Sequence, residues 1–377
     1  MSPDAALPAV VVAADKFKGS LTSAEVGEAV RRGLRAVRPG LEVRVVPVAD
    51  GGDGTLAAAA AGGYELVPVV ATGPTGAPVE TAFARRGDRA VVELADACGL
   101  ARLPGGRLAP WASSSRGAGE VLSAALDAGC RHVVLGIGGS ASSDGGAGLL
   151  AGLGARLLDR DGRVVEPGAR LGQVAGLDLS TLHPALPDAE VVVACDVDNP
   201  LLGPRGAAAV YGPQKGLSPA DVSRADDALT HWADLLDRST GTDHRATPGA
   251  GAAGGVGYAA LAGLGAHLRP GIDLVLELVG LAARLDGAGL VVTGEGSLDA
   301  QTAAGKAPAG VAAMAAAAGC EVVAVCGRRS LDDAALSAMG ISAAYALTDL
   351  EPDVGRCIAD AAHLLEVLAR QVATRLA

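Results

Sequence analysis

The chain has 377 residues, half of them apolar and only 2% aromatic, and its formal net charge at pH 7 is −11. This length is typical of two domains, whose cores must be built mainly from alanine, valine and leucine. An acidic chain without runs of lysine or arginine lacks the basic surface that nucleic-acid binding needs, so we expect no nucleic-acid partner.

The cysteines and the N-terminus indicate the compartment. The six cysteines lie mostly in apolar segments without C-x-x-C spacing, which is typical of buried thiols in a reducing environment. The first residues carry no secretory pattern, and glycines and charges interrupt the alanine-rich stretches before they reach the length of a membrane span. We therefore expect a cytoplasmic protein without a membrane partner.

The first 64 residues alternate between apolar runs and amphipathic stretches. Strands are predicted at 10–14 and 41–48, and helices at 24–37 and 55–61. Alternation of strand and helix is typical of parallel β-strands joined by helical crossovers.

From residue 65 the pattern changes to short strands joined by Gly-Pro and Gly-Asp turns, which favour antiparallel pairing. Later the alternation of strand and helix returns. The strands predicted beyond this point lie at 65–71, 79–84, 90–94, 132–135, 191–194, 289–292, 321–325 and 343–347, and the helices at 119–128, 307–318, 332–338 and 354–377.

These patterns predict an α/β protein in which one parallel-sheet domain is interrupted by another domain. We assign residues 1–64 and 287–377 to the outer, discontinuous domain and residues 65–286 to an inserted, mixed α/β domain. Right-handed crossovers favour the strand order 2-1-3-4-5 in the outer domain, which is the order of flavodoxin-like folds.

Three loops of the outer domain carry charged residues at the carboxyl ends of predicted strands, where open parallel sheets bind their ligands. They are residues 15–20 (DKFKGS), 50–55 (DGGDGT) and 293–299 (TGEGSLD). Acids on glycine-rich turns can hold Mg²⁺ through oxygen ligands, and lysines beside them can neutralise phosphate. The alternative for any single loop is an ordinary turn with an aspartate that caps a helix.

The inserted domain contributes four more glycine-rich segments, at 136–146, 195–200, 211–216 and 249–255. Backbone N–H groups of such turns can cradle a phosphate or a carboxylate. In the second of them, Asp196 and Asn199 are suited to bind a metal or orient a hydroxyl group. A plain tight turn at Asp198-Asn199-Pro200 explains the same residues equally well.

Several motifs point to other functions. Gly136-x-Gly138-x-x-Ala141 follows a predicted strand and resembles a dinucleotide-binding fingerprint, which keeps an NAD(P)-dependent oxidoreductase of a small hydroxy acid open as an alternative. A similar match at 249–254 follows no strand, and Gly305-Lys306 lacks the other residues of a phosphate-binding P-loop. No catalytic triad or zinc motif is evident. A non-enzymatic nucleotide-binding regulator is the third hypothesis.

Six long motifs, in order and over nearly the whole chain, resemble the bacterial glycerate kinases of the first type. They are residues 14–26 (ADKFKGSLTSAEV), 47–55 (PVADGGDGT), 136–155 (GIGGSASSDGGAGLLAGLGA), 195–216 (CDVDNPLLGPRGAAAVYGPQKG), 248–261 (PGAGAAGGVGYAAL) and 294–308 (GEGSLDAQTAAGKAP). The resemblance implies transfer of a phosphoryl group from ATP, with Mg²⁺, to D-glycerate, and most members are assigned 2-phospho-D-glycerate and ADP as products. Whether the chain forms a homodimer stays open.

The resemblance also suggests a role for each candidate residue. Lys18 and Lys215 would neutralise the transferring phosphoryl group, and Asp196 would orient or deprotonate the attacking hydroxyl group. Asp50, Asp53 and Glu295 would hold Mg²⁺ or orient the nucleotide. The candidates for binding the substrate or a phosphate are Asp15, Lys16, Gly19, Ser20, Gly139, Ser140, Asp144, Gly145, Gly146, Asn199 and Gln214, and those for binding the nucleotide are Gly51, Gly52, Gly54, Thr55, Gly294, Gly296, Asp299, Gln301 and Lys306.

Two departures from the family pattern are modest. Family members often have serine in place of Lys16 and glutamate in place of Asp53. Lys16 adds positive charge beside the expected phosphate site, and Asp53 shortens the reach of one acid. Because neither change removes a type of functional group, activity is still expected.

Overall fold

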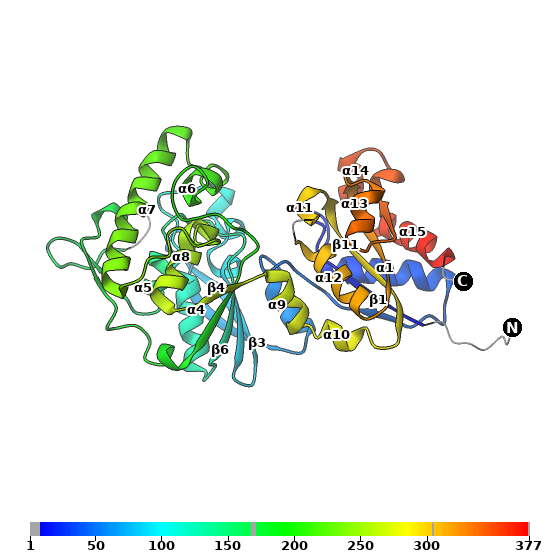
Figure 1. Ribbon diagram of the computed structural model, residues 1–377, viewed down its shortest axis with the longest axis horizontal. Helices are drawn as coiled ribbons and strands as arrows, with labels where there is room; N and C mark the ends of the chain where they lie inside the picture. Colours follow the sequence, from blue (N-terminus) through cyan, green and yellow to red (C-terminus); the bar gives the residue numbers. More distant parts are fainter. Residues whose placement is uncertain (1–7, 167–170, 304, 376–377) are drawn as a thin grey trace. The chain divides into compact units, whose positions relative to one another are not determined.

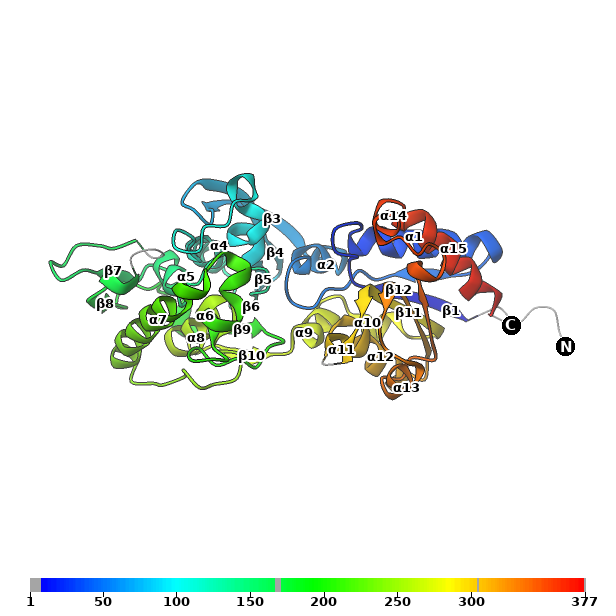
Figure 2. The ribbon, with the colours of Figure 1, turned by 90° about the horizontal axis from the view of Figure 1, so that it is seen from above.

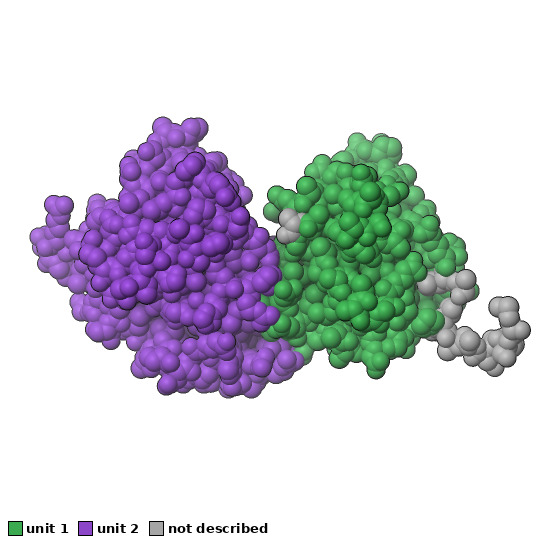
Figure 3. Space-filling model, in the orientation of Figure 1, with its two compact units in different colours: residues 1–50, 57–63, 272–377 green, residues 51–56, 64–271 purple. Residues whose placement is uncertain are grey.

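The computed structural model describes residues 8–166, 171–303 and 305–375. The chain forms two compact units (Figure 3). Unit 1 comprises the chain up to Asp50, residues Ala57–Gly63 and the chain from Ile272 onward, and unit 2 comprises Gly51–Leu56 and Tyr64–Gly271.

A five-stranded parallel sheet forms the centre of unit 1. Its strands are β1 (Ala9–Ala14), β2 (Val43–Val45), β11 (Ala288–Leu298), β12 (Glu321–Arg329) and β13 (Ala343–Ala346). They lie in the order β2-β1-β11-β12-β13, and every pair is parallel. Strands from the two ends of the chain therefore share one sheet, and their order is the expected 2-1-3-4-5.

Helices cover both faces of this sheet (Figure 1). They are α1 (Ser23–Val37), α2 (Thr55–Ala61), α9 (Gly271–Leu278), α10 (Leu281–Arg284), α11 (Ala300–Ala303), α12 (Ala307–Ala317), α13 (Asp333–Ala338), the 3₁₀ turn η6 (Leu347–Asp349), α14 (Val354–Ala359) and α15 (Ala361–Thr374). Successive residues of β1 point to opposite faces. Val10 and Val12 join the core with α1 and α15, whereas Val11 and Ala13 join the core with α9 and α12.

Several details of unit 1 differ from the sequence-based prediction. Residues Gly51–Leu56, which were expected in the outer domain, belong to unit 2. The second boundary lies at Ile272 rather than at residue 287, because Ile272, Val275 and Leu276 of α9 pack in the same core as β1 and β11. The predicted helix 354–377 is two helices separated at Asp360, and its last two residues lie outside the described part of the chain. Strand β2 is also shorter than predicted.

The third predicted loop of the outer domain is instead part of strand β11, which continues to Leu298. Its neighbour β12 also continues, to Arg329, and Ser297 pairs with Arg328. Glycine makes this close pairing feasible: a Cβ atom on Gly294 would lie 2.1 Å from the carbonyl oxygen of Val325. Gly294, Glu295 and Gly296 therefore sit on a strand rather than on a turn.

Unit 2 contains a six-stranded mixed sheet in the order β3-β4-β5-β6-β9-β10 (Figure 2). Strands β3, β4 and β5 pair antiparallel, as predicted. The remaining pairs, from β5 to β10, are parallel. The strands are β3 (Glu65–Thr72), β4 (Pro78–Arg86), β5 (Arg89–Glu93), β6 (His132–Gly136), β9 (Glu190–Ala194) and β10 (His267–Arg269), with a separate hairpin of β7 (Arg156–Leu158) and β8 (Gly176–Asp178).

The helices of unit 2 pack in two cores. They are α3 (Leu94–Cys98), α4 (Arg116–Asp127), α5 (Ala147–Gly152), α6 (Ala207–Tyr211), α7 (Pro219–Thr240) and α8 (Ala252–Leu264), with 3₁₀ turns η1 (Leu100–Arg102), η2 (Pro104–Gly106), η3 (Leu171–Gln173), η4 (Leu186–Asp188) and η5 (Pro213–Lys215). Residues of α4 and α8 pack on β5, β6 and β9 in one core, and α6 and α7 form the second core with the far side of α8. None of the described helices combines the length and apolar character needed to cross a lipid bilayer.

Candidate functional site

Three carboxylates meet at the carboxyl ends of the strands of unit 1. Asp15 follows β1, Asp50 lies beyond β2, and Glu295 lies in the extension of β11. The pKa of Asp15 is raised to about 7, mainly by burial and also by the nearby Asp50 and Glu295 carboxylates, against a lowering by Lys16. The sheet thus brings together three acids that are far apart in the sequence.

The Glu295 carboxylate interacts with two residues that follow it in the chain. The Thr302 hydroxyl donates a hydrogen bond of 2.5 Å to Glu295 Oε1, and Lys306 Nζ lies 4.0 Å from Oε2. Burial raises the pKa of Glu295, and these two partners oppose the rise. Asp299 acts locally, because its Oδ1 accepts the Gln301 N–H at 2.9 Å at the start of α11.

Lys18 lies in a tight turn that is held by the buried side chain of Phe17. The backbones of Phe17 and Leu21 exchange hydrogen bonds of 2.9 and 3.0 Å, and Gly19 has a φ of +84°, which favours glycine. Lys18 is exposed, and its backbone nitrogen would lie 3.4 Å from a Cβ atom on Gly296. Helix α1 begins after its N-cap residue Thr22, so Lys18 lies in the turn that precedes the helix and not at the helix N-terminus itself.

In unit 2 a second group forms where two glycine-rich segments pack backbone against backbone. A Cβ atom on Gly136 would lie 2.7 Å from the carbonyl oxygen of Gly51, and one on Gly138 would lie 2.6 Å from the Cα of Gly52. Asp53 follows and is exposed. The segment Gly51–Leu56 therefore lies at the carboxyl end of β6 in its own unit.

Lys215 is the buried centre of the second group. Its ammonium donates hydrogen bonds to Ser140 Oγ, at 2.7 Å, and to the carbonyl oxygen of Ser142. Only 2% of its surface is exposed, and burial lowers its pKa to about 7 while the Asp144 carboxylate opposes the drop. Gly254 must be glycine here, because it has a φ of +71° and a Cβ atom would lie 2.2 Å from the same Ser142 oxygen.

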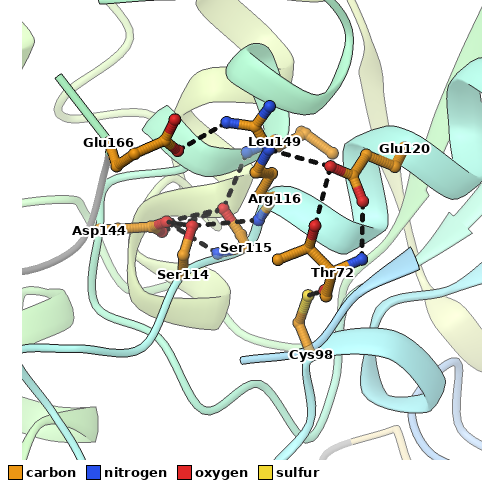
Figure 4. Close-up of polar contacts among 9 residues, drawn as sticks. All are labelled: Thr72, Cys98, Ser114, Ser115, Arg116, Glu120, Asp144, Leu149 and Glu166. Atoms are coloured by element: carbon orange, nitrogen blue, oxygen red, sulfur yellow. Dashed lines mark hydrogen bonds and ion pairs between the residues drawn. The ribbon is translucent and has the colours of Figure 1, made fainter. Parts of the chain in front are cut away.

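The carboxylate of Asp144 accepts hydrogen bonds from residues of its own unit, unit 2 (Figure 4). Its carboxylate accepts hydrogen bonds from the backbone and hydroxyl group of Ser115, from the Ser114 hydroxyl and from the N–H groups of Gly146 and Gly148, at 2.8–3.3 Å. It is 1% exposed. These contacts fix the turn before α5 to the start of α4, which gives Asp144 a structural role.

The segment after β9 presents two exposed acids, Asp196 and Asp198. Asp196 is exposed, and its Oδ1 accepts the N–H of Gly271 at 2.7 Å. The amide of Asn199 is used internally, because it accepts from the Tyr211 hydroxyl at 2.5 Å and donates to the carbonyl oxygen of Arg205 at 2.8 Å. Gln214 is exposed next to Lys215.

The candidate residues thus form two groups, one in each unit. The unit 1 group comprises Asp15, Lys16, Lys18, Gly19, Ser20, Asp50, Gly294, Glu295, Gly296, Asp299, Gln301 and Lys306, and the unit 2 group comprises Gly51, Gly52, Asp53, Gly54, Thr55, Gly139, Ser140, Asp144, Gly145, Gly146, Asp196, Asn199, Gln214 and Lys215. In the described part of the chain, no set of three or more histidine, cysteine or acidic side chains is arranged to hold a metal ion.

Two further residues in these groups escaped the sequence analysis. Thr302 is fully buried and binds Glu295, and its only signal was its place in the last glycine-rich motif. Glu93, at the end of β5, is 5% exposed and accepts the N–H groups of Gly54 and Leu56. A single glutamate at the end of an apolar strand gave no hint of that contact.

Comparison with known proteins adds independent information. The model of the glycerate kinase family matches residues 10–377. The chain is 42% identical to a glycerate kinase of Bacillus subtilis (strain 168) over 371 residues, 97% of each chain, and 40% identical to the glycerate 2-kinase of Escherichia coli (strain K12) over 343 residues, 90% of each. A crystal structure described as glycerate kinase 2 from Salmonella typhimurium LT2 shares 40% identity and a TM-score of 0.83, covering 98% of each chain.

Proposed function

From the premise that the chain belongs to the glycerate kinase family, we propose that it transfers the γ-phosphoryl group of ATP to D-glycerate and releases 2-phospho-D-glycerate and ADP. The family match over residues 10–377 carries this proposal. The assignment to the 2-hydroxyl group rests on the resemblance to the glycerate 2-kinase of Escherichia coli. We also propose that the enzyme works in the cytoplasm and that unit 1 is a flavodoxin-like domain.

The candidates for holding Mg²⁺ are the carboxylates of Asp50, Asp53 and Glu295. Carboxylate oxygens suit a hard cation, and a cation near Asp15 would offset the burial and the repulsion from Asp50 and Glu295 that raise its pKa. Mg²⁺ usually binds one or two carboxylates together with substrate phosphates, so a ready-made cluster of three acids is not required. When bound, the ion would neutralise charge on the phosphates of ATP.

The chain's own residues would do the remaining work by positioning and by charge. Lys18 is exposed in its turn and is suited to pair with the phosphoryl group. Asp196 presents an exposed carboxylate that would accept the proton of the attacking hydroxyl group. Lys215 is enclosed by the loop that it binds, so we assign it an indirect role: it keeps Ser140 in place.

The nucleotide would contact the glycine-rich segments. In unit 1 these are Gly294 and Gly296, with Asp299, Gln301 and Lys306, and in unit 2 they are Gly51, Gly52, Gly54 and Thr55. The substrate carboxylate or a phosphate would contact Gly139, Ser140, Gly145 and Gly146, and also Asp15, Lys16, Gly19, Ser20, Asn199 and Gln214. These assignments rest on the family resemblance and on the grouping of the residues within each unit.

Product analysis tests the proposal directly. The protein is incubated with D-glycerate, ATP and Mg²⁺, and the product is identified by phosphorus and proton NMR against authentic 2- and 3-phosphoglycerate. We expect 2-phosphoglycerate, and no turnover when NAD⁺ or NADP⁺ replaces ATP. Formation of 3-phosphoglycerate would refute the assigned position, and absence of any phosphorylated product would refute the function.

A further inference from the structure

We propose that Glu93 is a positioning residue of this enzyme: its carboxylate holds the backbone of the segment Gly51–Leu56 and so fixes Asp53 beside Gly139 and Ser140. The inference rests on the proposed function, in which Asp53 contacts the bound Mg²⁺–nucleotide. It assigns a role to a residue outside every motif that identified the family.

Glu93 uses both of its carboxylate oxygens on one segment. Oε1 accepts the N–H of Gly54 at 3.1 Å and Oε2 accepts the N–H of Leu56 at 2.9 Å. These N–H groups flank the start of α2, where backbone donors have no partner inside the helix. A carboxylate can accept from both at once, whereas a glutamine has only one accepting oxygen.

Close packing fixes the same segment from another direction. Gly52 lies against Gly138 so closely that a single added carbon on Gly138 would stand 2.6 Å from its Cα. Thr55 is fully buried, and its hydroxyl donates to the carbonyl oxygen of Gly52 at 2.6 Å. With the backbone held in this way, a sideways shift of the segment would produce a clash.

Asp53 is the one residue of Gly51–Leu56 that is exposed. A Cβ atom on Gly139 would lie 4.0 Å from the Cβ of Asp53, which places the aspartate next to the turn that carries Ser140. Ser140 is itself held by Lys215. Glu93 and Lys215 are thus two buried ionisable groups, each of which secures one side of the same small surface.

An ordinary helix cap does not account for this choice of residue. N-caps are normally short side chains next to the helix, such as serine, threonine or aspartate, and they need no buried charge. Glu93 comes from another strand and is 5% exposed, and burial raises its pKa to about 7, with Asp53 among the charges that add to the rise. Placing a second acid close to Asp53 is unfavourable, which is understandable if the position of Asp53 matters.

The test compares Glu93→Gln, Asp53→Asn and the double variant. If Glu93 acts through Asp53, each single variant should lower kcat/KM for MgATP by about 10²-fold. The double variant should lose little more, so that its kcat/KM stays within about threefold of that of the less active single variant. Glu120→Gln is the matched control, because Glu120 also accepts a backbone N–H, that of Thr72 at 2.7 Å (Figure 4). The control should stay within about threefold of wild type.

A second readout does not depend on activity. Hydrogen–deuterium exchange of the peptide that covers residues 51–56 should become at least about tenfold faster in Glu93→Gln and remain unchanged in Glu120→Gln. Unchanged exchange, or losses of kcat/KM that multiply in the double variant, would overturn the proposal. If Glu93→Gln does not fold, Glu93→Asp, which keeps the charge but loses reach, is held to the same thresholds.

The failure of this inference can be distinguished from failure of the proposed function. A wild-type enzyme that does not phosphorylate D-glycerate refutes the function. Normal wild-type turnover, combined with a Glu93→Gln enzyme that melts at a lower temperature yet retains more than half of kcat/KM, overturns the positioning role alone and leaves Glu93 as a cap of α2.

Discussion

Replacing Lys215 with methionine should change how the stability of the protein depends on pH. Methionine is similar in length and apolar, so it fills the site without a charge. In the wild type the buried amine has a pKa of about 7, lowered from the usual lysine value of 10.5 by its removal from water. The unfolded chain keeps its proton on Lys215 up to the higher value.

The direction of this pH dependence follows from the number of protons that the folded and unfolded states bind. Below pH 7 the amine is charged in both states, and the folded protein carries the full cost of a buried charge. Between pH 7 and 10.5 the unfolded state binds more protons, so stability rises with pH. From pH 7 to 9 the free energy of unfolding of the wild type should rise by about 2 kcal/mol relative to that of Lys215→Met.

Urea denaturation of both proteins at pH 7, 8 and 9 measures this difference. All other titrating groups are common to the two proteins, so their effects cancel when the curves are subtracted. A difference that stays constant from pH 7 to 9 would show that Lys215 keeps its proton throughout this range, so burial would not lower its pKa to about 7.

Three other changes test the remaining assignments. Lys18→Ala should leave the melting temperature unchanged but lower kcat by about 10²-fold, and Lys16→Ala should cost less; near-normal turnover of Lys18→Ala would rule out a phosphate-binding role. EDTA should abolish turnover and excess Mg²⁺ should restore it, so full activity in EDTA would contradict the metal assignment. Gly138→Ala should destabilise the protein by about 1–3 kcal/mol, because the new methyl group would meet the backbone of Gly52; an unchanged urea midpoint would show that the two segments can separate without cost.

Hydrophobic patterning made the arrangement of strands predictable. The order of the sheet in unit 1 followed from right-handed crossovers, and the Gly-Pro and Gly-Asp turns correctly indicated the antiparallel strands β3–β5. The prediction was wrong where glycine had been taken as a sign of a turn. Gly294 and Gly296 belong to an extended strand, because glycine also permits two backbones to approach closely.

The contacts and burial of individual side chains could not be predicted from the sequence. The sequence pattern placed Lys215 in a glycine-rich loop, which is typical of an exposed phosphate-binding lysine, yet the loop folds around it. The Glu93 carboxylate accepts the N–H of Leu56, which lies 37 residues earlier in the chain, and a local sequence pattern cannot predict such a contact. Asp144 lies among glycines as a ligand-binding acid would, and the sequence did not indicate that its carboxylate accepts hydrogen bonds from Ser114 and Ser115 at the start of α4.

The division of unit 1 along the chain has a consequence for how the protein is made. Strand β1 lies between β2 and β11 in the sheet, but β11 begins only at Ala288, after the whole of unit 2 has been synthesised. Domains generally fold as units while the chain is being made. Unit 2 can therefore complete its sheet when β10 emerges, whereas the apolar faces of β1 and α1 must wait for β11 and α15. The residues that leave the ribosome first are among the last to be enclosed.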